Sequence, residues 1–196
     1  ELMEADSSAL DLSGLRAMFA EMLARIDADA GRLEAAFPWF IRKRAPVSGV
    51  ESLLDIDAAL RVEQCAGGQP QTTLRVVVPV TSLCPCSKEI SAYGAHNQRS
   101  QITLEVTLRE DMSFEELVRI AEEEASCELF GLLKRPDEKW VTERAYDNPK
   151  FVEDLVRDIA LRLRAEPRIA AWQVASENFE SIHNHSAWAT VSGAND

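Results

Sequence analysis

Hydrophobic and polar residues alternate over residues 54–62 of this 196-residue chain. Leu54 and Ile56 fall on one face of this stretch, and Asp55 falls on the other. Such a period of two is typical of an antiparallel strand with one buried and one solvated face. Similar patterns predict strands over residues 32–44, 71–80, 101–109, 168–176 and 186–191. Because proline cannot donate to a strand ladder, Pro38 indicates a sheet edge or a bulge.

Apolar residues spaced three or four apart predict helices in other parts of the chain. The first helix covers residues 12–30 and stops at Gly31. The acidic, unpatterned residues 1–11 before it are expected to be a frayed lead-in. Ser113 and Glu116 form the capping box of the next helix.

The pattern after that helix predicts one or two more helical turns through residues 129–133, with Cys127 in the core. Residues 134–139 then form a charged loop. Asn148 is expected to cap another helix, with Pro149 at its first position. The order of one helix, strands, two helices and strands is typical of an α+β fold.

Composition and charge narrow the class of protein. The chain is 46% hydrophobic, which is enough for a sizeable core. A net charge of −12 argues against nonspecific binding to nucleic acid or to an anionic membrane. The sequence contains no run of 18 apolar residues, so it predicts no membrane-spanning helix. Four cysteines and an N-terminus without signal-peptide features favour a reduced, cytoplasmic protein.

Two cysteines one residue apart follow the central predicted strand. Cys84 and Cys86 flank a proline, and if this piece is extended, both thiols point to the same side. His96 and the cations Lys88 and Arg99 lie in the same connection between strands. Thiols and an imidazole in one loop suit zinc or iron(II). The alternatives for these thiols are small buried side chains or a strained redox pair.

Other candidate side chains have ordinary interpretations of comparable weight. His183 and His185 would share a face of extended chain, although a histidine is commonly a surface or hydrogen-bonded residue. Glu138, Glu153 and Glu180 are solvated charges by default. From the residues alone, we predict an α+β protein with a Cys/His/carboxylate metal site, a hydrolytic activity and an anionic substrate.

The string over residues 79–100 resembles the signature of the type IB GTP cyclohydrolases. Residues 132–139, 148–154 and 176–185 also resemble that family, so the resemblance covers essentially the whole chain. It implies a tunnelling fold, in which antiparallel sheets and paired helices from several subunits close a barrel. It implies a homotetramer with active sites at subunit interfaces. Residues 1–196 are then one domain of two fused modules, and the family's N-terminal strands are expected to be missing.

The resemblance also implies a reaction and a cofactor. The reaction converts GTP and water to 7,8-dihydroneopterin triphosphate and formate, which starts the route to tetrahydrofolate. The cofactor is a divalent metal, namely zinc, manganese or iron(II), that activates the attacking water. The positions that match the metal ligands are Cys84, His96 and Glu138, with His183 as a weaker fourth candidate.

Further roles follow from the same resemblance. Cys86 matches the catalytic cysteine that contacts the purine near C8. Glu153 matches the carboxylate that anchors guanine through its N1–H and amino group, which suits an acceptor-only side chain. His185 and Glu180 are expected to move protons in ring opening or in the sugar rearrangement. We assign the triphosphate to four cations near these segments: Lys88, Arg99, Lys134 and Arg135.

Two other functions compete with this one. Another tunnelling-fold enzyme, such as a nitrile reductase, would also use a nucleophilic cysteine but would need a nicotinamide cofactor instead of a hydrolytic metal. A metal-binding or scaffolding protein would hold its metal in a closed site with four protein ligands.

Overall fold

The computed structural model describes residues 11–195, so residues 1–10 of the predicted lead-in lie outside the described part, and its last residue, Asp11, is the N-cap of the first helix. Its helices are α2 (Leu12–Arg25), α3 (Pro85–Ile90), α4 (Phe114–Glu124), α5 (Arg135–Asp147) and α6 (Val152–Ala165). Its strands are β1 (Gly31–Arg44), β2 (Glu51–Gln64), β3 (Gln71–Leu83), β4 (Asn97–Leu108), β5 (Cys127–Glu128), β6 (Ile169–Asn178) and β7 (Ala187–Ala194). Among these elements, no helix is long and apolar enough to cross a membrane.

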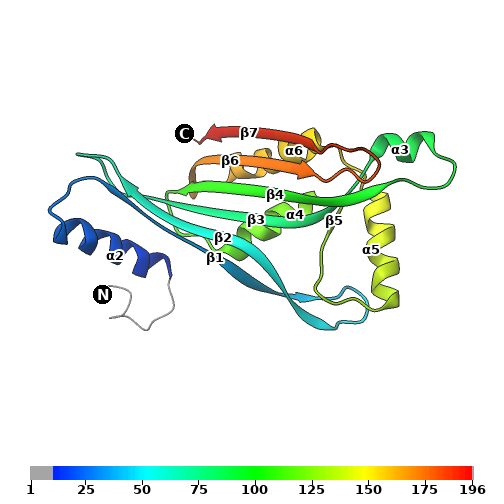
Figure 1. The fold of residues 1–196 in the computed structure, drawn as a ribbon, viewed down its shortest axis with the longest axis horizontal. Helices are drawn as coiled ribbons and strands as arrows, with labels where there is room; N and C mark the ends of the chain where they lie inside the picture. Colours follow the sequence, from blue (N-terminus) through cyan, green and yellow to red (C-terminus); the bar gives the residue numbers. More distant parts are fainter. Residues whose placement is uncertain (1–10, 196) are drawn as a thin grey trace.

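One antiparallel sheet organises the described residues (Figure 1). Its strand order is β1-β2-β3-β4-β6-β7, and the short β5 pairs with β3. The predicted edge position of Pro38 is confirmed, because β1 is the outermost strand on its side. The α+β class predicted from the sequence is confirmed.

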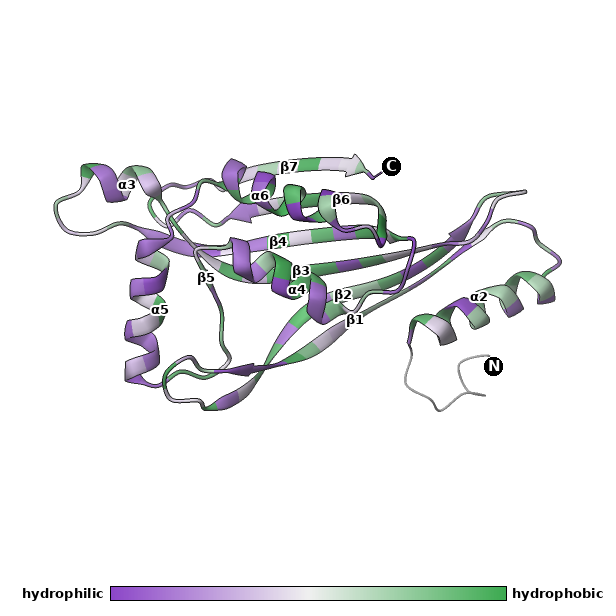
Figure 2. Cartoon of the chain, turned by 180° about the vertical axis from the view of Figure 1, so that it is seen from behind, coloured by the Kyte–Doolittle hydropathy of each residue, from purple (hydrophilic) through white to green (hydrophobic). Residues whose placement is uncertain are grey.

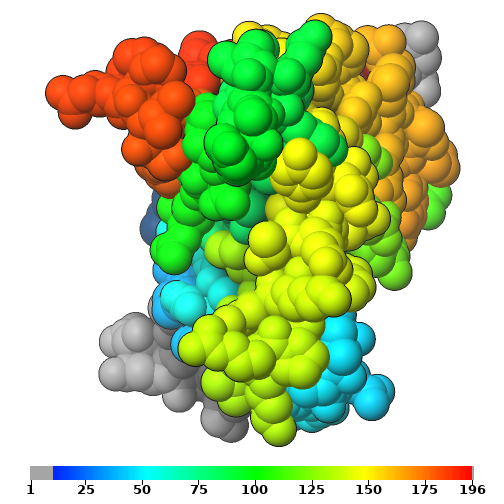
Figure 3. Space-filling model, turned by 90° about the vertical axis from the view of Figure 1, so that its right-hand side faces the viewer, coloured from blue at the N-terminus to red at the C-terminus, as the bar shows by residue number. Residues whose placement is uncertain are grey.

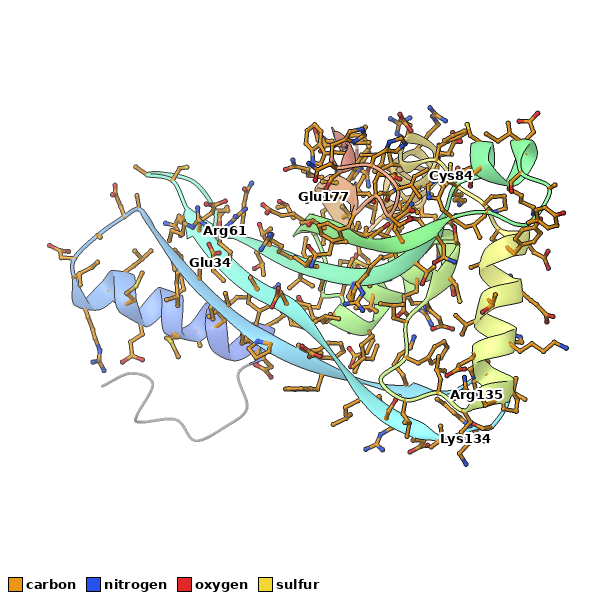
Figure 4. All side chains as sticks on the ribbon, turned by 45° about the vertical axis from the view of Figure 1, so that its right-hand side comes forward. Glu34, Arg61, Cys84, Lys134, Arg135 and Glu177 are labelled. Atoms are coloured by element: carbon orange, nitrogen blue, oxygen red, sulfur yellow. The ribbon has the colours of Figure 1, made fainter. Side chains whose placement is uncertain are left out.

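Helices α4 and α6 pack on the same face of this sheet (Figures 1 and 2). The side chains beneath them show no exposed surface, as at Val76, Val78, Ile102 and Leu104. Burying each such side chain stabilises the fold by at most about 1.5–3 kcal/mol. The opposite face carries polar side chains such as Arg61, whose guanidinium donates to the Glu105 carboxylate at 2.8 Å (Figure 4). The residues that alternate with a period of two along the strands thus form a buried apolar face and an opposite polar face of the sheet.

The first helix is shorter than predicted. It ends at Arg25, and Gly31 begins strand β1 instead of stopping a helix. The chain turns at Asp27, which has a positive φ of 52°. A Cβ on Gly31 would lie 2.9 Å from Leu23 Cδ2. This glycine therefore permits the close approach of the strand to α2, a role that a sequence pattern does not separate from helix termination.

The predicted helical turns over residues 129–133 are wrong. Helix α4 ends at Glu124, and the chain continues extended into β5, where Cys127 is buried as predicted but on a strand. A Cβ on Gly131 would lie 2.4 Å from the carbonyl oxygen of Leu53. Tight packing of this segment against β2 therefore overrides the helical spacing of its leucines.

Two further boundaries differ from the prediction. Residues 134–139 are not a charged loop, because α5 begins at Arg135. Asn148 does not cap the following helix; it is the C-cap of α5, and Phe151 is the N-cap of α6. Proline and acidic residues favour the first turn of a helix. This segment was nevertheless predicted to be a loop, because its residues are mostly charged.

A buried cluster of charges connects β1, α4 and β5. Lys43 Nζ donates to Glu122 Oε2 at 2.8 Å and to Glu128 Oε2, and it lies 5.2 Å from the Phe130 ring centroid. The side chains of Lys43 and Glu122 are 8% and 10% exposed. Burial raises the pKa of Glu122, although the hydrogen bond from Lys43 opposes this effect. The cluster thus fixes β5, which precedes α5 in the sequence, against β1 and α4.

Candidate active site

Helix α3 carries the two neighbouring cysteines. Cys84 is its N-cap residue, and the Cys84 Sγ accepts from the Ser87 backbone N–H at 3.5 Å. Cys86 is exposed in the first turn. The piece is therefore not extended beyond Cys84, because the proline between the cysteines takes a first-turn position of a helix. The two thiols are placed by helical geometry and not by the alternation of a strand.

His96 lies directly beside the start of α3. The Cys84 backbone N–H donates to the His96 carbonyl oxygen at 3.2 Å, and the His96 N–H donates to Ser87 Oγ at 3.1 Å. The His96 Nδ1 lies 3.0 Å from Gln98 Oε1. Cys84 and His96, predicted as metal ligands, are thus brought together by short contacts.

The connection from β6 to β7 approaches the same place. The Phe179 N–H donates to the Arg99 carbonyl oxygen at 3.0 Å, which holds the start of this connection against β4. Glu180 Oε2 lies 3.9 Å from His96 Nδ1. His183 and His185 follow on the connection, exposed, with their rings stacked 5.1 Å apart. Figure 3 shows this orange-red segment beside the green segment of α3 at one end of the molecule.

Other predicted site residues lie elsewhere. Figure 4 shows Lys134 and Arg135 at the opposite end of α5 from Cys84. Glu138 is in the first turns of α5, where it pairs with Arg135 at 2.8 Å. Glu138 precedes Tyr146, near α3, by eight residues, or about 12 Å of helix. Within residues 11–195, no three His, Cys, Asp or Glu side chains are grouped closely enough to hold a metal ion.

The donor chemistry near α3 nevertheless fits part of a metal site. Cys84 supplies a thiol, and His96 has its Nδ1 engaged by Gln98, which leaves Nε2 as the nitrogen for a metal. Thiolate and imidazole are the ligands that zinc and iron(II) accept.

Two of the predicted triphosphate cations lie near α3. Lys88 Nζ donates to the Tyr146 carbonyl oxygen and lies 4.2 Å from the centroid of the Tyr146 ring. Lys88 thus fastens α3 to the C-terminal end of α5, where a cation is favourable. Arg99 lies on β4 and is exposed.

Glu153, the predicted guanine anchor, is exposed in the first turn of α6. It lines an open cavity of about 370 Å³ between α6 and β7, together with Arg157, Trp172 and Thr190. A carboxylate there is accessible to a ligand from outside this chain.

Asp137 was missed by the sequence analysis. It is fully buried at the start of α5 and accepts from the Val47 and Ser48 N–H groups, both at 2.8 Å, and from Ser48 Oγ at 2.6 Å. It also accepts from the Lys134 N–H at 2.9 Å. Burial raises the pKa of Asp137, but hydrogen bonds from Ser48, Lys134 and Val47 outweigh it and hold the pKa well below its ordinary value. An acid right after the Arg-Pro pair was the signal available in the sequence.

Comparison with known proteins gives a consistent result. A family model described as type I GTP cyclohydrolase folE2 matches residues 1–189. A GTP cyclohydrolase FolE2 1 of Dechloromonas aromatica (strain RCB) is 74% identical over all 196 residues, which span 74% of that protein. A GTP cyclohydrolase FolE2 2 of Cupriavidus metallidurans is 63% identical over 190 residues, 97% of this chain and 71% of that protein.

Solved structures that resemble this chain do so in fold, at low sequence identity. The uricase of Arthrobacter globiformis superposes with a TM-score of 0.55 at 10% identity, over 98% of this chain and 72% of that one. A uricase from Bacillus fastidious gives a TM-score of 0.53 at 15% identity, over 97% of this chain and 69% of that one. These neighbours have the tunnelling fold, so the tunnelling fold predicted from the sequence is confirmed.

Proposed function

Because the chain belongs to the type I GTP cyclohydrolase folE2 family, we propose that it converts GTP and water to 7,8-dihydroneopterin triphosphate and formate. This reaction is the first step of folate biosynthesis. The observation that carries the proposal is the grouping of Cys84, Cys86 and His96 around α3, with Glu180 3.9 Å from the His96 ring. The type IB subclass and a cytoplasmic location are part of the same proposal.

The chemistry assigns separate tasks to these side chains. Water adds at C8 of the purine, the imidazole ring opens, C8 leaves as formate, and the ribose carbons recyclise. The exposed Cys86 thiol contacts the purine near C8. Glu180 and His185 take and return protons during ring opening and the sugar rearrangement, and both lie on the connection that approaches His96.

A divalent metal held by Cys84 and the Nε2 of His96 is part of the proposal. Glu138 is the third proposed ligand and His183 a weaker fourth. The metal is zinc, manganese or iron(II), and when bound it supplies Lewis acidity and an activated water near neutral pH.

A neighbouring subunit completes the proposed site. Glu138 lies on the far part of α5 from the contact of Lys88 with Tyr146, and within residues 11–195 it is not grouped with Cys84 and His96. A homotetramer with shared sites supplies Glu138, Lys134 and Arg135 from a second copy. Arg99, Lys134 and Arg135 are all exposed, which suits cations that bind a triphosphate.

Glu153 is the proposed guanine anchor. A carboxylate accepts both from the guanine N1–H and from its amino group, whereas an amide accepts through one oxygen only. Glu153→Gln is therefore expected to raise the KM for GTP by roughly tenfold, since a charge-assisted hydrogen bond contributes about 1.5–3 kcal/mol. Asp154→Asn is the matched control, because Asp154 is engaged with Arg157 on the same helix. An unchanged KM in Glu153→Gln removes this residue from the guanine site.

The activity is tested with protein stripped by a chelator and refilled separately with zinc, manganese and iron(II). We expect formate release from GTP together with the fluorescence of an oxidised pterin, both dependent on added metal. NADPH oxidation with a deazapurine nitrile, without formate from GTP, would instead identify a nitrile reductase. Bound metal without either activity would identify a structural metal site.

A further inference from the structure

We propose that four buried polar residues, Gln98, Ser82, Ser100 and Asn178, form a hydrogen-bond chain that fixes the tautomer and the orientation of His96. The proposal rests on the proposed function only for the importance of His96. These four residues are positioning residues, because they act on the site through the His96 ring.

The chain of contacts is continuous from the interior of the sheet to His96. Asn178 Oδ1 accepts from Ser100 Oγ at 2.8 Å, and Ser100 Oγ lies 2.6 Å from Ser82 Oγ. Gln98 Nε2 donates to Ser82 Oγ at 3.1 Å, and Gln98 Oε1 lies 3.0 Å from His96 Nδ1. The residues come from the three adjacent strands β3, β4 and β6.

The donors and acceptors allow one direction along this chain. The Asn178 Oδ1 only accepts, so the Ser100 hydroxyl gives its proton to Asn178. The Ser82 hydroxyl must then give its proton to Ser100, and its own oxygen accepts from the Gln98 amide. This arrangement turns the Gln98 Oε1 toward His96. The His96 Nδ1 must therefore carry a proton, and the Nε2 holds the lone pair of the neutral ring.

The surroundings of the His96 Nδ1 agree with this direction. Besides Gln98 Oε1, it faces Ser181 Oγ at 3.5 Å and Glu180 Oε2 at 3.9 Å, and both oxygens can accept. A ring that donated from Nε2 instead would leave Nδ1 as an acceptor facing the Gln98 oxygen. Two acceptors that face each other repel, so that tautomer is disfavoured.

The hydrogen-bond chain is buried, which makes an unpaired member costly in free energy and a fully paired chain rigid. The four residues are 7%, 2%, 0% and 4% exposed in the order Gln98, Ser82, Ser100 and Asn178. Their neighbours on the same strands include the fully buried Val80 and Ile102. A buried polar group costs free energy unless it is paired, and a fully paired network holds one geometry. The pairing of these four buried side chains with one another thus holds Gln98, and through it the His96 ring, in one geometry.

The test measures the His96 tautomer directly, in the metal-free full chain labelled with ¹⁵N-histidine. Long-range ¹H–¹⁵N correlation spectra distinguish a ring protonated on Nδ1 from one protonated on Nε2. We expect Nδ1 protonation in the unsubstituted protein and a shift toward the Nε2-protonated form in Gln98→Met. Gln98→Glu keeps an acceptor facing the ring and should keep the tautomer. Gln101→Met, at an exposed glutamine of the same strand, is the matched control.

Two further measurements complete the test. Ser100→Ala interrupts the hydrogen-bond chain at a residue that does not contact His96. We expect it to give a mixture of the two tautomers, because the Gln98 amide is then free to rotate by 180°. Zinc affinity, measured by competition with a chelator, should fall roughly 10- to 100-fold in Gln98→Met, as for other residues that orient a metal-binding histidine. An unchanged tautomer in Gln98→Met or in Ser100→Ala overturns the proposal. Because the spectra need no turnover of GTP, they separate this result from a failure of the proposed activity.

Discussion

Replacing Lys43 by methionine tests the buried charge cluster. Methionine keeps the apolar stem but removes the ammonium that contacts Glu122 and Glu128. Removing one partner of a buried ion pair costs about 3–5 kcal/mol, because the remaining charge is left buried. The Glu128 side chain is 34% exposed, so water relieves part of this cost. We therefore expect a loss of about 3 kcal/mol in the free energy of unfolding.

The cost should depend on pH in a defined direction. The folded-state pKa of Glu122 is raised, so stability from its protonated form is present at low pH and is lost as pH rises through that pKa. Loss of Lys43 removes the hydrogen bond that opposes the shift, which raises the pKa further. The difference between the two proteins should be smaller at low pH, where Glu122 is protonated in both, and should grow as pH rises through the raised pKa of Glu122.

Urea unfolding followed by circular dichroism measures these differences. Arg42→Met is the matched control, because Arg42 forms an exposed pair with Glu51 and should cost less than about 1 kcal/mol. A triple variant that adds Glu122→Gln and Glu128→Gln to Lys43→Met should recover most of the loss. A loss below about 1 kcal/mol, or one that does not grow with pH, would refute the reasoning.

The remaining predictions concern α3 and α5. Asp137→Asn should destabilise α5 and lower the melting temperature more than Ser48→Ala does. Because the folded-state pKa of Asp137 is lowered, its contribution is present above its ordinary pKa and is lost as pH falls through the folded-state pKa. The difference in stability between the variant and the unsubstituted protein should therefore shrink in acid, and a difference that stays constant as pH falls would contradict this expectation. Because Lys88 fastens α3 to α5, Lys88→Met should speed amide exchange in α3 and lower kcat more than it raises KM, with Tyr146→Phe unchanged. A rise in KM alone would instead support the predicted role of Lys88 in binding the triphosphate. Cys86→Ala should abolish turnover and keep the metal, whereas loss of metal would make Cys86 a ligand.

The sequence predicted correctly the features that depend on the local pattern or on the chemistry of a single residue. The alternation over residues 54–62 is confirmed by β2, and the capping box of Ser113 and Glu116 is present at α4. The edge position of Pro38 also followed, because a missing backbone donor restricts a residue wherever it lies. These features depend on neighbours a few residues away, which a sequence displays directly.

Tertiary contacts decided the elements that the sequence missed. Helix α5 lacks a broad apolar stripe and appears mostly hydrophilic in Figure 2, and its start depends on Asp137 reaching Val47 and Ser48, about 90 residues earlier in the chain. The path after α4 depends on the contact of Gly131 with Leu53. Such contacts leave no periodic trace, so residues 129–139 were assigned to the wrong elements.

The candidate site was predicted in part for the same reason. Cys84 and His96 lie close together in sequence, and one short helix connects them in space. Glu138 and Glu153 lie on α5 and α6, and in the proposed homotetramer it is the contact between subunits that would bring them to the cysteines. The assignment of these two carboxylates stays a prediction.

The fate of one carbon atom tests the central claim most directly. GTP labelled with ¹³C at C8 is incubated with the metal-loaded protein, and the products are followed by ¹³C NMR spectroscopy. We expect labelled formate and an unlabelled dihydroneopterin triphosphate in equal amounts. Label that stays in the purine, or formate that forms without a pterin, would contradict it.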